Sequence, residues 1–86
     1  MAKEEIRDAK RNKIGYMDRK LNGECVIYDK RSNKIGTIKP QGDRLIAYDK
    51  RNIKLGYWDE SSNTTFDAKG KRLGKENLLM GFYEFT

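Results

Sequence analysis

The feature that most constrains the fold is a nine-residue pattern that occurs four times in the 86-residue chain. Two copies are nearly identical: YDKRSNKIG at residues 28–36 and YDKRNIKLG at residues 48–56. RDAKRNKIG at residues 7–15 and FDAKGKRLG at residues 66–74 follow the same pattern. In each copy an Asp precedes a Gly by seven positions, and successive Asp residues are 21, 20 and 18 positions apart. This regularity indicates one structural unit used four times.

Each copy has the composition of a β-hairpin turn. An Asp at the start of a turn accepts hydrogen bonds from main-chain groups two residues further on. Asn or Gly then occupies the tip, where we expect a positive φ that these residues tolerate best. The predicted tip residues are Asn12, Asn33, Asn52 and Gly70. Short runs rich in Val, Ile, Tyr and Leu flank the tips, as expected for paired strands.

Other turn signals lie between the copies. NGE at residues 22–24 contains Asn-Gly, which predicts a tight two-residue turn. PQGDR at 40–44 and ESSNT at 60–64 predict turns as well. The sequence therefore predicts a single all-β domain over residues 1–86, an antiparallel meander of about eight short strands that forms a curled sheet or a small barrel-like arrangement.

The predicted strands follow from these turns. They cover residues 13–18, 24–29, 34–39, 44–49, 54–59, 64–67, 72–76 and 79–85. The repeat also implies a first strand near residues 4–8, although the local composition there suits a short helix equally well.

The hairpin pattern predicts which residues share a face of the sheet. With Asp29 opposite Lys34, Tyr28 pairs with Ile35 and the register continues through the hairpin. One face then carries Ile14, Tyr16, Val26, Tyr28, Ile35, Ile46, Tyr48, Leu55, Tyr57, Phe66 and Leu73. The other face carries Met17, Cys25, Ile27, Ile38, Leu45, Ala47, Trp58 and the repeated glycines. The face shared with Ile35 and Leu55 favours a core position for Tyr28 and Tyr48.

Both predicted faces are apolar, so the second face must also be covered. Three arrangements would achieve this. The sheet closes on itself, the C-terminal LLMGFYEF at residues 78–85 folds over it, or a second copy packs there as a homodimer or higher oligomer. The repeated glycines indicate a sharp bend or the close approach of another backbone.

The positive charge is concentrated at the predicted tips. The net charge is +6, yet the four windows 8–15, 29–36, 49–56 and 67–74 hold twelve of the nineteen Lys and Arg against four Asp, a net +8. The candidate residues of this basic ridge are Lys10, Arg11, Lys30, Arg31, Lys50, Arg51, Lys69 and Lys71. Such a ridge attracts anionic polymers. The alternative is that these cations only solvate the sheet edge or pair with the repeated Asp.

One aromatic residue is expected to contribute to a binding surface. Trp58 and Tyr57 are adjacent in a predicted strand, so one of the two points away from the core. We predict that Trp58 is the partly exposed contact residue.

Several chemistries are excluded or disfavoured by composition. The chain has no His, which removes the commonest general base and metal ligand. Cys25 is the one cysteine and lies in an apolar strand, which favours a core position over a nucleophile. The four Asp are on separate tips beside cations, so we expect low pKa values and no calcium site. We therefore predict no enzymatic activity, no cofactor and no metal.

The N-terminal MAKEEIRDAK lacks the apolar region of a secretory signal, and no segment has the length and hydropathy of a membrane span. We therefore expect a cytoplasmic protein that does not insert into membranes.

The repeat resembles short β-hairpin repeat families, namely YD repeats and MORN repeats. The resemblance covers Arg7 to Gly74 and rests on YDKRSNKIG and its copies. It implies a scaffold that displays a surface for binding, with lipid or protein contacts in the MORN case. The chain departs from YD repeats in carrying Asn instead of Gly at three of four tips, and it lacks the Y-G-W-G pattern of MORN repeats. No functional residue is carried over.

These observations favour a small non-catalytic interaction module that binds a protein partner or itself. The alternative is a nucleic-acid-binding protein that uses the basic ridge. A third interpretation is an inhibitor that presents cations to an acidic or nucleic-acid-binding partner.

Overall fold

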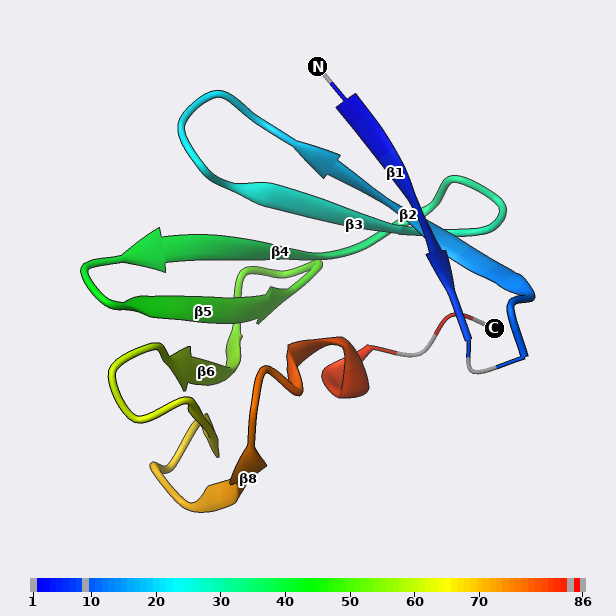
Figure 1. The fold of residues 1–86 in the computed structure, drawn as a ribbon. Helices are drawn as coiled ribbons and strands as arrows, with labels where there is room; N and C mark the ends of the chain where they lie inside the picture. The colour runs from blue at the N-terminus through cyan, green and yellow to red at the C-terminus, as the bar shows by residue number, and fades with distance from the viewer. Residues whose placement is uncertain (1, 9, 84, 86) are drawn as a thin grey trace.

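The computed structural model describes residues 2–8, 10–83 and 85. Within them, eight strands form one antiparallel sheet in which each strand pairs with its neighbours in sequence (Figure 1). The strands are β1 (Ala2–Arg7), β2 (Lys13–Arg19), β3 (Cys25–Asp29), β4 (Lys34–Gln41), β5 (Arg44–Asp49), β6 (Lys54–Asp59), β7 (Thr64–Asp67) and β8 (Arg72–Lys75). The predicted all-β meander is confirmed, and the sheet is curled, with β1 and β8 at its two edges.

The last predicted strand is wrong. The chain turns back after β8 and forms a short 3₁₀ helix, η1 (Leu79–Phe82), in place of a strand over residues 79–85. Thr65 holds this reversal, because its hydroxyl donates to the Glu76 carbonyl at 2.7 Å and accepts from the Leu78 N–H at 3.0 Å. The implied first strand is confirmed as β1.

The four repeat tips share one geometry. At the second tip, Oδ1 of Asp29 accepts the main-chain N–H of Arg31 and of Asn33, each at 2.9 Å. The residue three positions after the Asp takes the positive φ, as in a type I turn followed by one left-handed residue. These left-handed residues are Arg11, Ser32, Asn52 and Gly70, with φ of 67°, 70°, 63° and 87°.

The prediction of positive φ was therefore right at Asn52 and Gly70 and wrong at Asn12 and Asn33. In all four tips the Asp carboxylate binds the N–H groups two and four positions further on, and the left-handed residue lies between them, whatever its type.

The Asn-Gly sequence does not form the predicted two-residue turn. The Lys20 N–H donates to the Glu24 carbonyl, and Gly23 takes the positive φ of 91°, as in the repeat tips. A two-residue turn occurs instead at Gly42 and Asp43, between the paired residues Gln41 and Arg44.

A β-bulge follows each repeat tip and changes the predicted register. Tyr28 pairs with Lys34 and Ile27 with Gly36, so both Lys34 and Ile35 lie opposite Tyr28. The corresponding irregularity occurs between Ile6 and Arg7, Ala47 and Tyr48, and Thr65 and Phe66. The predicted pairing of Tyr28 with Ile35 is therefore wrong, whereas the pairing of Ile27 with Gly36 and the rest of the hairpin is confirmed.

The bulge also places the aliphatic and the aromatic residues of the repeat on opposite faces of the sheet. Ile35 and Leu55 pack against the core cluster, which consists of Ile27, Ile38, Ala47, Leu79 and Tyr83. Tyr28 and Tyr48, whose predicted core position is not borne out, lie half-buried outside this cluster. An extra residue in one strand shifts the alternation of side chains by one, which moves Ile35 to the face opposite Tyr28.

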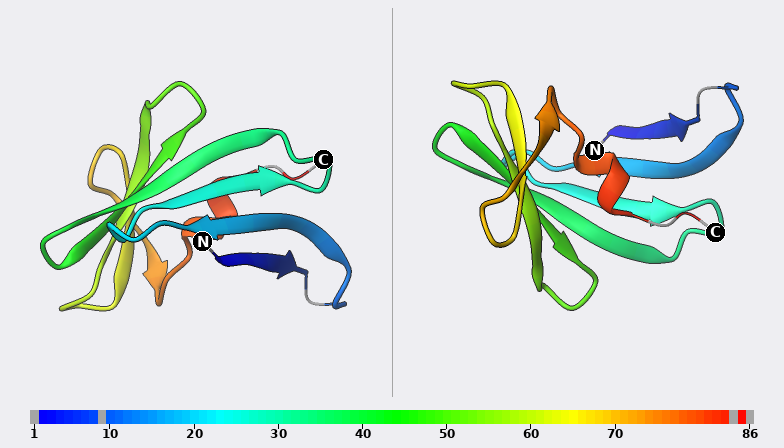
Figure 2. Two further views of the ribbon diagram at one scale, coloured as in Figure 1. Left: turned by 90° about the horizontal axis from the view of Figure 1, so that it is seen from above. Right: turned by 90° about the horizontal axis from the view of Figure 1, so that it is seen from below.

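The C-terminal residues cover the concave inner face of the sheet. η1 lies inside the curl of the strands (Figures 1 and 2), and the Phe85 ring lies against Gly15 of β2. We call residues 78–83 and 85 the C-terminal arm. Leu79 is fully buried and Tyr83 is 8% exposed, and both belong to the core cluster. Of the three arrangements that would cover the second face, the structure has the folded-over C-terminal segment.

The glycine that ends each repeat makes room for one side chain of the arm. The pairs are Gly15 with Phe85, Gly36 with Tyr83, Gly56 with Phe82 and Gly74 with Leu78. At the first three glycines an added Cβ would also come within 3.0 Å of a main-chain carbonyl oxygen of the neighbouring strand. The expected close approach is therefore found, and it involves both a backbone and an aromatic ring.

No helix in the described part of the chain has the length and hydropathy of a membrane span.

Candidate functional site

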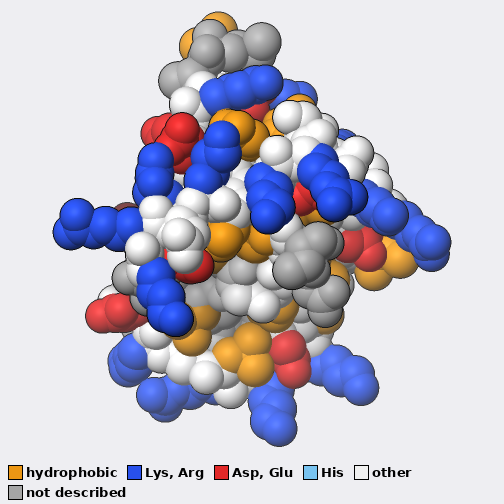
Figure 3. All heavy atoms as spheres, turned by 90° about the vertical axis from the view of Figure 1, so that its right-hand side faces the viewer, with side chains coloured by type: hydrophobic (Ala, Val, Ile, Leu, Met, Phe, Trp, Pro, Cys, Tyr) orange, Lys and Arg blue, Asp and Glu red, His pale blue; other side chains and the backbone are white. Residues whose placement is uncertain are grey.

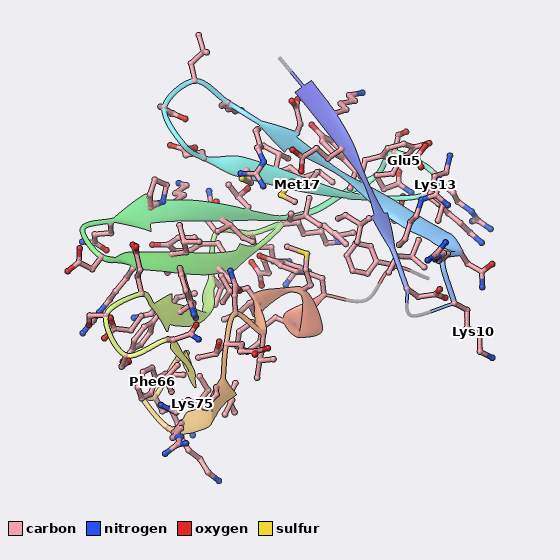
Figure 4. The ribbon with its side chains drawn as sticks, viewed as in Figure 1. Glu5, Lys10, Lys13, Met17, Phe66 and Lys75 are labelled. Carbon is pink, nitrogen blue, oxygen red and sulfur yellow. The ribbon has the colours of Figure 1, made fainter. Side chains whose placement is uncertain are left out.

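The meander places the four repeat tips at one end of the strands and the other three turns at the opposite end. The candidate cations in the four repeat tips are all exposed. We call them the tip cations: Lys10, Arg11, Lys30, Arg31, Lys50, Arg51, Lys69 and Lys71. The twist of the sheet turns successive hairpins relative to one another, so the tips form a fan and not a straight ridge (Figure 2). Figure 4 shows Lys10 extending away from the ribbon at the first tip.

The tip carboxylates do not neutralise the tip cations. Each Asp binds main-chain N–H groups of its own turn, as in the bonds of Asp49 to Arg51 at 2.8 Å and to Ile53 at 2.9 Å. Within residues 2–8, 10–83 and 85, ion pairs join Arg7 to Glu5 and Arg19 to Glu4, and none includes a tip cation. The alternative in which the repeated Asp pairs with the repeated Lys is therefore not what the structure shows.

The turn bonds also lower the pKa of tip carboxyls. The main-chain N–H of Asn12 is the largest cause of the lowered pKa of Asp8. The N–H of Asn33 has the same effect on the pKa of Asp29, and Arg31 adds a smaller electrostatic contribution. At Asp8 and Asp29 the low pKa thus arises mainly from hydrogen bonds, and a neighbouring cation contributes only at Asp29.

Two open hollows lie beside the tips, one repeat apart. The first is lined by Lys13, Ile14, Asp29, Lys30, Arg31 and Phe85. The second is lined by Ile35, Asp49, Lys50, Arg51, Leu55, Phe82 and Tyr83. Figure 3 shows this side of the molecule, with Lys and Arg side chains around smaller apolar areas. Basic groups and arm rings therefore meet at the same end of the sheet.

A second set of rings lies on the outer face, opposite the arm. Tyr16 pairs with Tyr28 across β2 and β3, and Tyr57 pairs with Phe66 across β6 and β7. The rings of Tyr57 and Phe66 stack with centroids 5.0 Å apart and planes inclined by 24°. All these rings and that of Tyr48 are half-buried. The outer face thus carries half-buried aromatic rings that lie outside the core cluster of the C-terminal arm.

Cations lie over most of these rings. The ring centroid is 5.9 Å from Nζ of Lys3 at Tyr28, 4.8 Å from Nζ of Lys13 at Tyr16 and 5.3 Å from Nζ of Lys39 at Tyr48. The Tyr57 ring has both the Arg44 guanidinium at 4.7 Å and Nζ of Lys54 at 4.9 Å. Sequence reasoning missed this surface because it assigned Tyr28 and Tyr48 to the core.

Trp58 is oriented opposite to the prediction. Its half-buried ring packs against the inner core cluster, and its Nε1–H donates to Oδ1 of Asn63 at 3.0 Å. Tyr57, stacked on Phe66, is the one of the pair that faces outward. Trp58 therefore belongs to the rim of the core and lies away from the outer-face rings.

Two further residues bear on chemistry. Cys25 packs against the core cluster, and burial raises the pKa of its thiol, which opposes nucleophilic reactivity. Asp18 is 8% exposed, and its Oδ1 has no hydrogen-bond partner among the described residues. In the same part of the chain, no group of three His, Cys, Asp or Glu side chains is arranged to hold a metal ion.

Comparison with protein-family models, with curated proteins and with solved structures finds no match for this chain.

Proposed function

We propose that the protein is a small non-catalytic binding module whose tip cations bind nucleic acid. The observation that carries the proposal is that eight exposed Lys and Arg lie in the four repeat tips, at the same end of their strands, without ion pairs among the described residues. Their binding free energy is therefore not reduced by the loss of existing salt bridges. Neutralising phosphates with these side chains releases condensed counterions, which favours association at low salt.

The spacing of the tips suits a polymer. Every second strand carries a tip, and strands about 4.8 Å apart put neighbouring tips about 10 Å apart near the sheet. Long Lys and Arg side chains at this spacing reach successive phosphates of one chain. Such contacts are made to the backbone, so we expect little dependence on base sequence.

A protein partner or a second copy is the other function that the sequence favoured. That function was favoured mainly because the inner face must be covered, and the C-terminal arm of the same chain covers it. We therefore place nucleic acid first. The cytoplasmic location belongs to the same proposal, and it is supported by the single cysteine, which forms no disulfide within the chain.

Fluorescence anisotropy with labelled DNA and RNA of about 20 nucleotides tests the proposal, because a ligand of that length spans several tips. The affinity should fall steeply as salt rises from about 50 to 200 mM. Lys30→Glu with Lys50→Glu should weaken binding by about tenfold or more.

The matched control is Lys20→Glu with Lys75→Glu, which changes the net charge equally at the opposite end of the strands. The control should weaken binding clearly less than the tip variant. Equal losses in the two variants would show a general charge effect and remove the assignment to the tips. No binding of any oligonucleotide at about 50 mM salt would reject the function.

A further inference from the structure

We infer that the outer face binds single-stranded nucleic acid by stacking bases on Tyr28, Tyr48, Tyr57 and Phe66. The inference rests on the proposed function and specifies its substrate class as a single strand. The cations that now lie over the rings would contact the phosphates of the stacked nucleotides.

The repeat places one ring beside each of three tips. Tyr28, Tyr48 and Phe66 directly precede the Asp that opens their tips, so each lies at the tip end of its strand. The first copy has Arg7 at this position, and Tyr16 of β2 supplies a ring nearby through its pairing with Tyr28. A ring at the tip end of the strand therefore recurs with the period of the repeat, and Lys3 and Lys39 lie over two of these rings.

The rings are flanked by buried apolar residues. Val26 and Ile46 are 5% and 7% exposed, lie outside the inner core cluster and share the face of Tyr28 and Tyr48 two positions along the same strands. The stacked pair of Tyr57 and Phe66 restrains two of the rings. A platform held in this way requires little reorganisation when a base stacks on it.

Each cation over a ring can be exchanged for a base. A base stacked on an aromatic side chain binds more strongly than an exposed ammonium group over the same ring. The displaced side chain, such as Lys39 at 5.3 Å from the Tyr48 centroid, remains within reach of the phosphate attached to that base. One nucleotide therefore satisfies both members of the pair.

The acidic groups of this face are outnumbered by the five cations that lie over its rings. Glu5 is paired with Arg7, and Asp59 accepts hydrogen bonds from the N–H and hydroxyl of Ser61 at 3.1 and 2.8 Å. Asp18 is buried between its neighbours. The exposed charge around the rings is therefore mainly that of Lys and Arg.

The fan-shaped arrangement of the tips favours a flexible ligand over a stiff one. The molecule measures 32 × 29 × 22 Å, so a ligand that follows the fan bends within a few tens of ångströms. Duplex DNA has a persistence length of about 500 Å and resists this curvature. A single strand follows it readily and exposes its bases for stacking.

Three polymers separate stacking from charge. Titrations should compare a single-stranded oligonucleotide of about 20 nucleotides, the corresponding duplex and inorganic polyphosphate, which has no bases. We expect the single strand to bind about tenfold more tightly than the duplex. Tyr28→Leu with Tyr48→Leu should lower single-strand affinity by about tenfold or more and leave polyphosphate binding unchanged.

Two controls distinguish the loss of stacking from the misfolding of a variant. Tyr28→Phe with Tyr48→Phe retains both rings and should retain single-strand binding. Photo-crosslinking of the unaltered protein to an oligonucleotide that contains 5-iodouracil should label the peptides that carry Tyr28, Tyr48 or Tyr57, and this readout does not depend on the folding of a variant.

The outcomes distinguish the two proposals. If single strand, duplex and polyphosphate bind alike and crosslinks avoid the outer face, the stacking inference is overturned while nucleic-acid binding by the tips stands. If no nucleic acid binds, both fail. Tighter binding of poly-glutamate than of any nucleic acid would overturn both and indicate an acidic protein partner.

Discussion

At the residue scale, one carboxylate organises each hairpin tip. Oδ1 of Asp67 accepts the N–H of Lys69 at 2.9 Å and of Lys71 at 2.8 Å, and the other three tips repeat this arrangement. The carboxylate satisfies main-chain donors that the tight turn leaves without partners in the ladder. The geometry shared by the tips therefore needs a side-chain acceptor at this position, and at Asp8 and Asp29 the lowered pKa shows that the ionised carboxylate is the favoured form.

Replacement of Asp29 tests this role. Asp29→Ala should lower the thermal unfolding midpoint, and Asp29→Asn should lower it less because the amide retains a carbonyl acceptor. Thermal melts followed by circular dichroism measure both variants. A midpoint unchanged in Asp29→Ala would contradict the assigned role.

The pH dependence has a definite sign. The pKa of Asp29 is lower in the folded state, so its stabilisation is present above the unfolded value of about 3.9. It is lost as the pH falls through the lower folded pKa. We therefore expect the difference in midpoint between the wild type and Asp29→Ala to shrink in strongly acidic buffer. A difference that grows on acidification would refute this.

Tyr83 is a second residue with a specific bond. Its buried hydroxyl lies 3.0 Å from the Tyr48 carbonyl oxygen and 3.3 Å from that of Thr37, and it can donate to either. Burial raises its pKa. Tyr83→Phe keeps the ring but loses the donor, so we expect a loss of about 1 kcal/mol in the free energy of unfolding, measured by urea denaturation.

At the element scale, the repeats and the C-terminal arm form one packing unit. Each hairpin ends in a glycine, and each glycine receives one arm side chain. Removing the Cβ lets the arm lie close to the strands, so its rings fill the concave face where the curled sheet alone would leave apolar area exposed. The repeat therefore encodes both the turn and the space for the arm.

The glycines differ in how tightly they are packed. An added Cβ at Gly36 would overlap the Tyr83 ring and the Tyr48 carbonyl oxygen, whereas at Gly74 it would meet only the flexible end of Leu78 at 3.0 Å. We expect Gly36→Ala to destabilise the protein by about 2 kcal/mol or more. Gly74→Ala is the matched control and should lose clearly less. Equal effects in urea denaturation would argue against the packing described here.

At the scale of the whole molecule, the two faces of the sheet differ in what covers them. The inner face is covered by Leu79, Phe82, Tyr83 and Phe85 of the same chain, and the outer face carries rings with cations over them. The charge of +6 also opposes close approach of two copies at low salt. Both properties favour a protein that stays single in solution.

Light scattering coupled to size exclusion measures this directly. We expect the mass of one chain, 10.1 kDa, at micromolar concentration. Leu79→Ala should expose the inner face and destabilise the fold by about 2–5 kcal/mol. A dimer of the unaltered protein would contradict the expectation that one chain stays single in solution.

The sequence by itself determined the meander, the position of the four tips and most of the strand pairing. Turn chemistry and side-chain alternation are local properties, and four copies of one pattern reinforce each other. The bulge also follows from the sequence, once the length of the turn is known. A five-residue turn from Asp29 to Asn33 leaves two residues before Gly36 but only one between Ile27 and Asp29. The two strands therefore cannot remain in step.

Only the tertiary structure decided how the faces are used. Both faces are apolar in the sequence, so composition alone does not identify the inner one. The bulge moves Ile35 to the inner face. The arm packs on that face because the repeat glycines there leave room for Tyr83 and Phe85. As a result, Trp58 packs at the rim of the inner core, and the strand tyrosines lie on the outer face. These choices depend on contacts between residues up to about seventy positions apart, which no local pattern specifies.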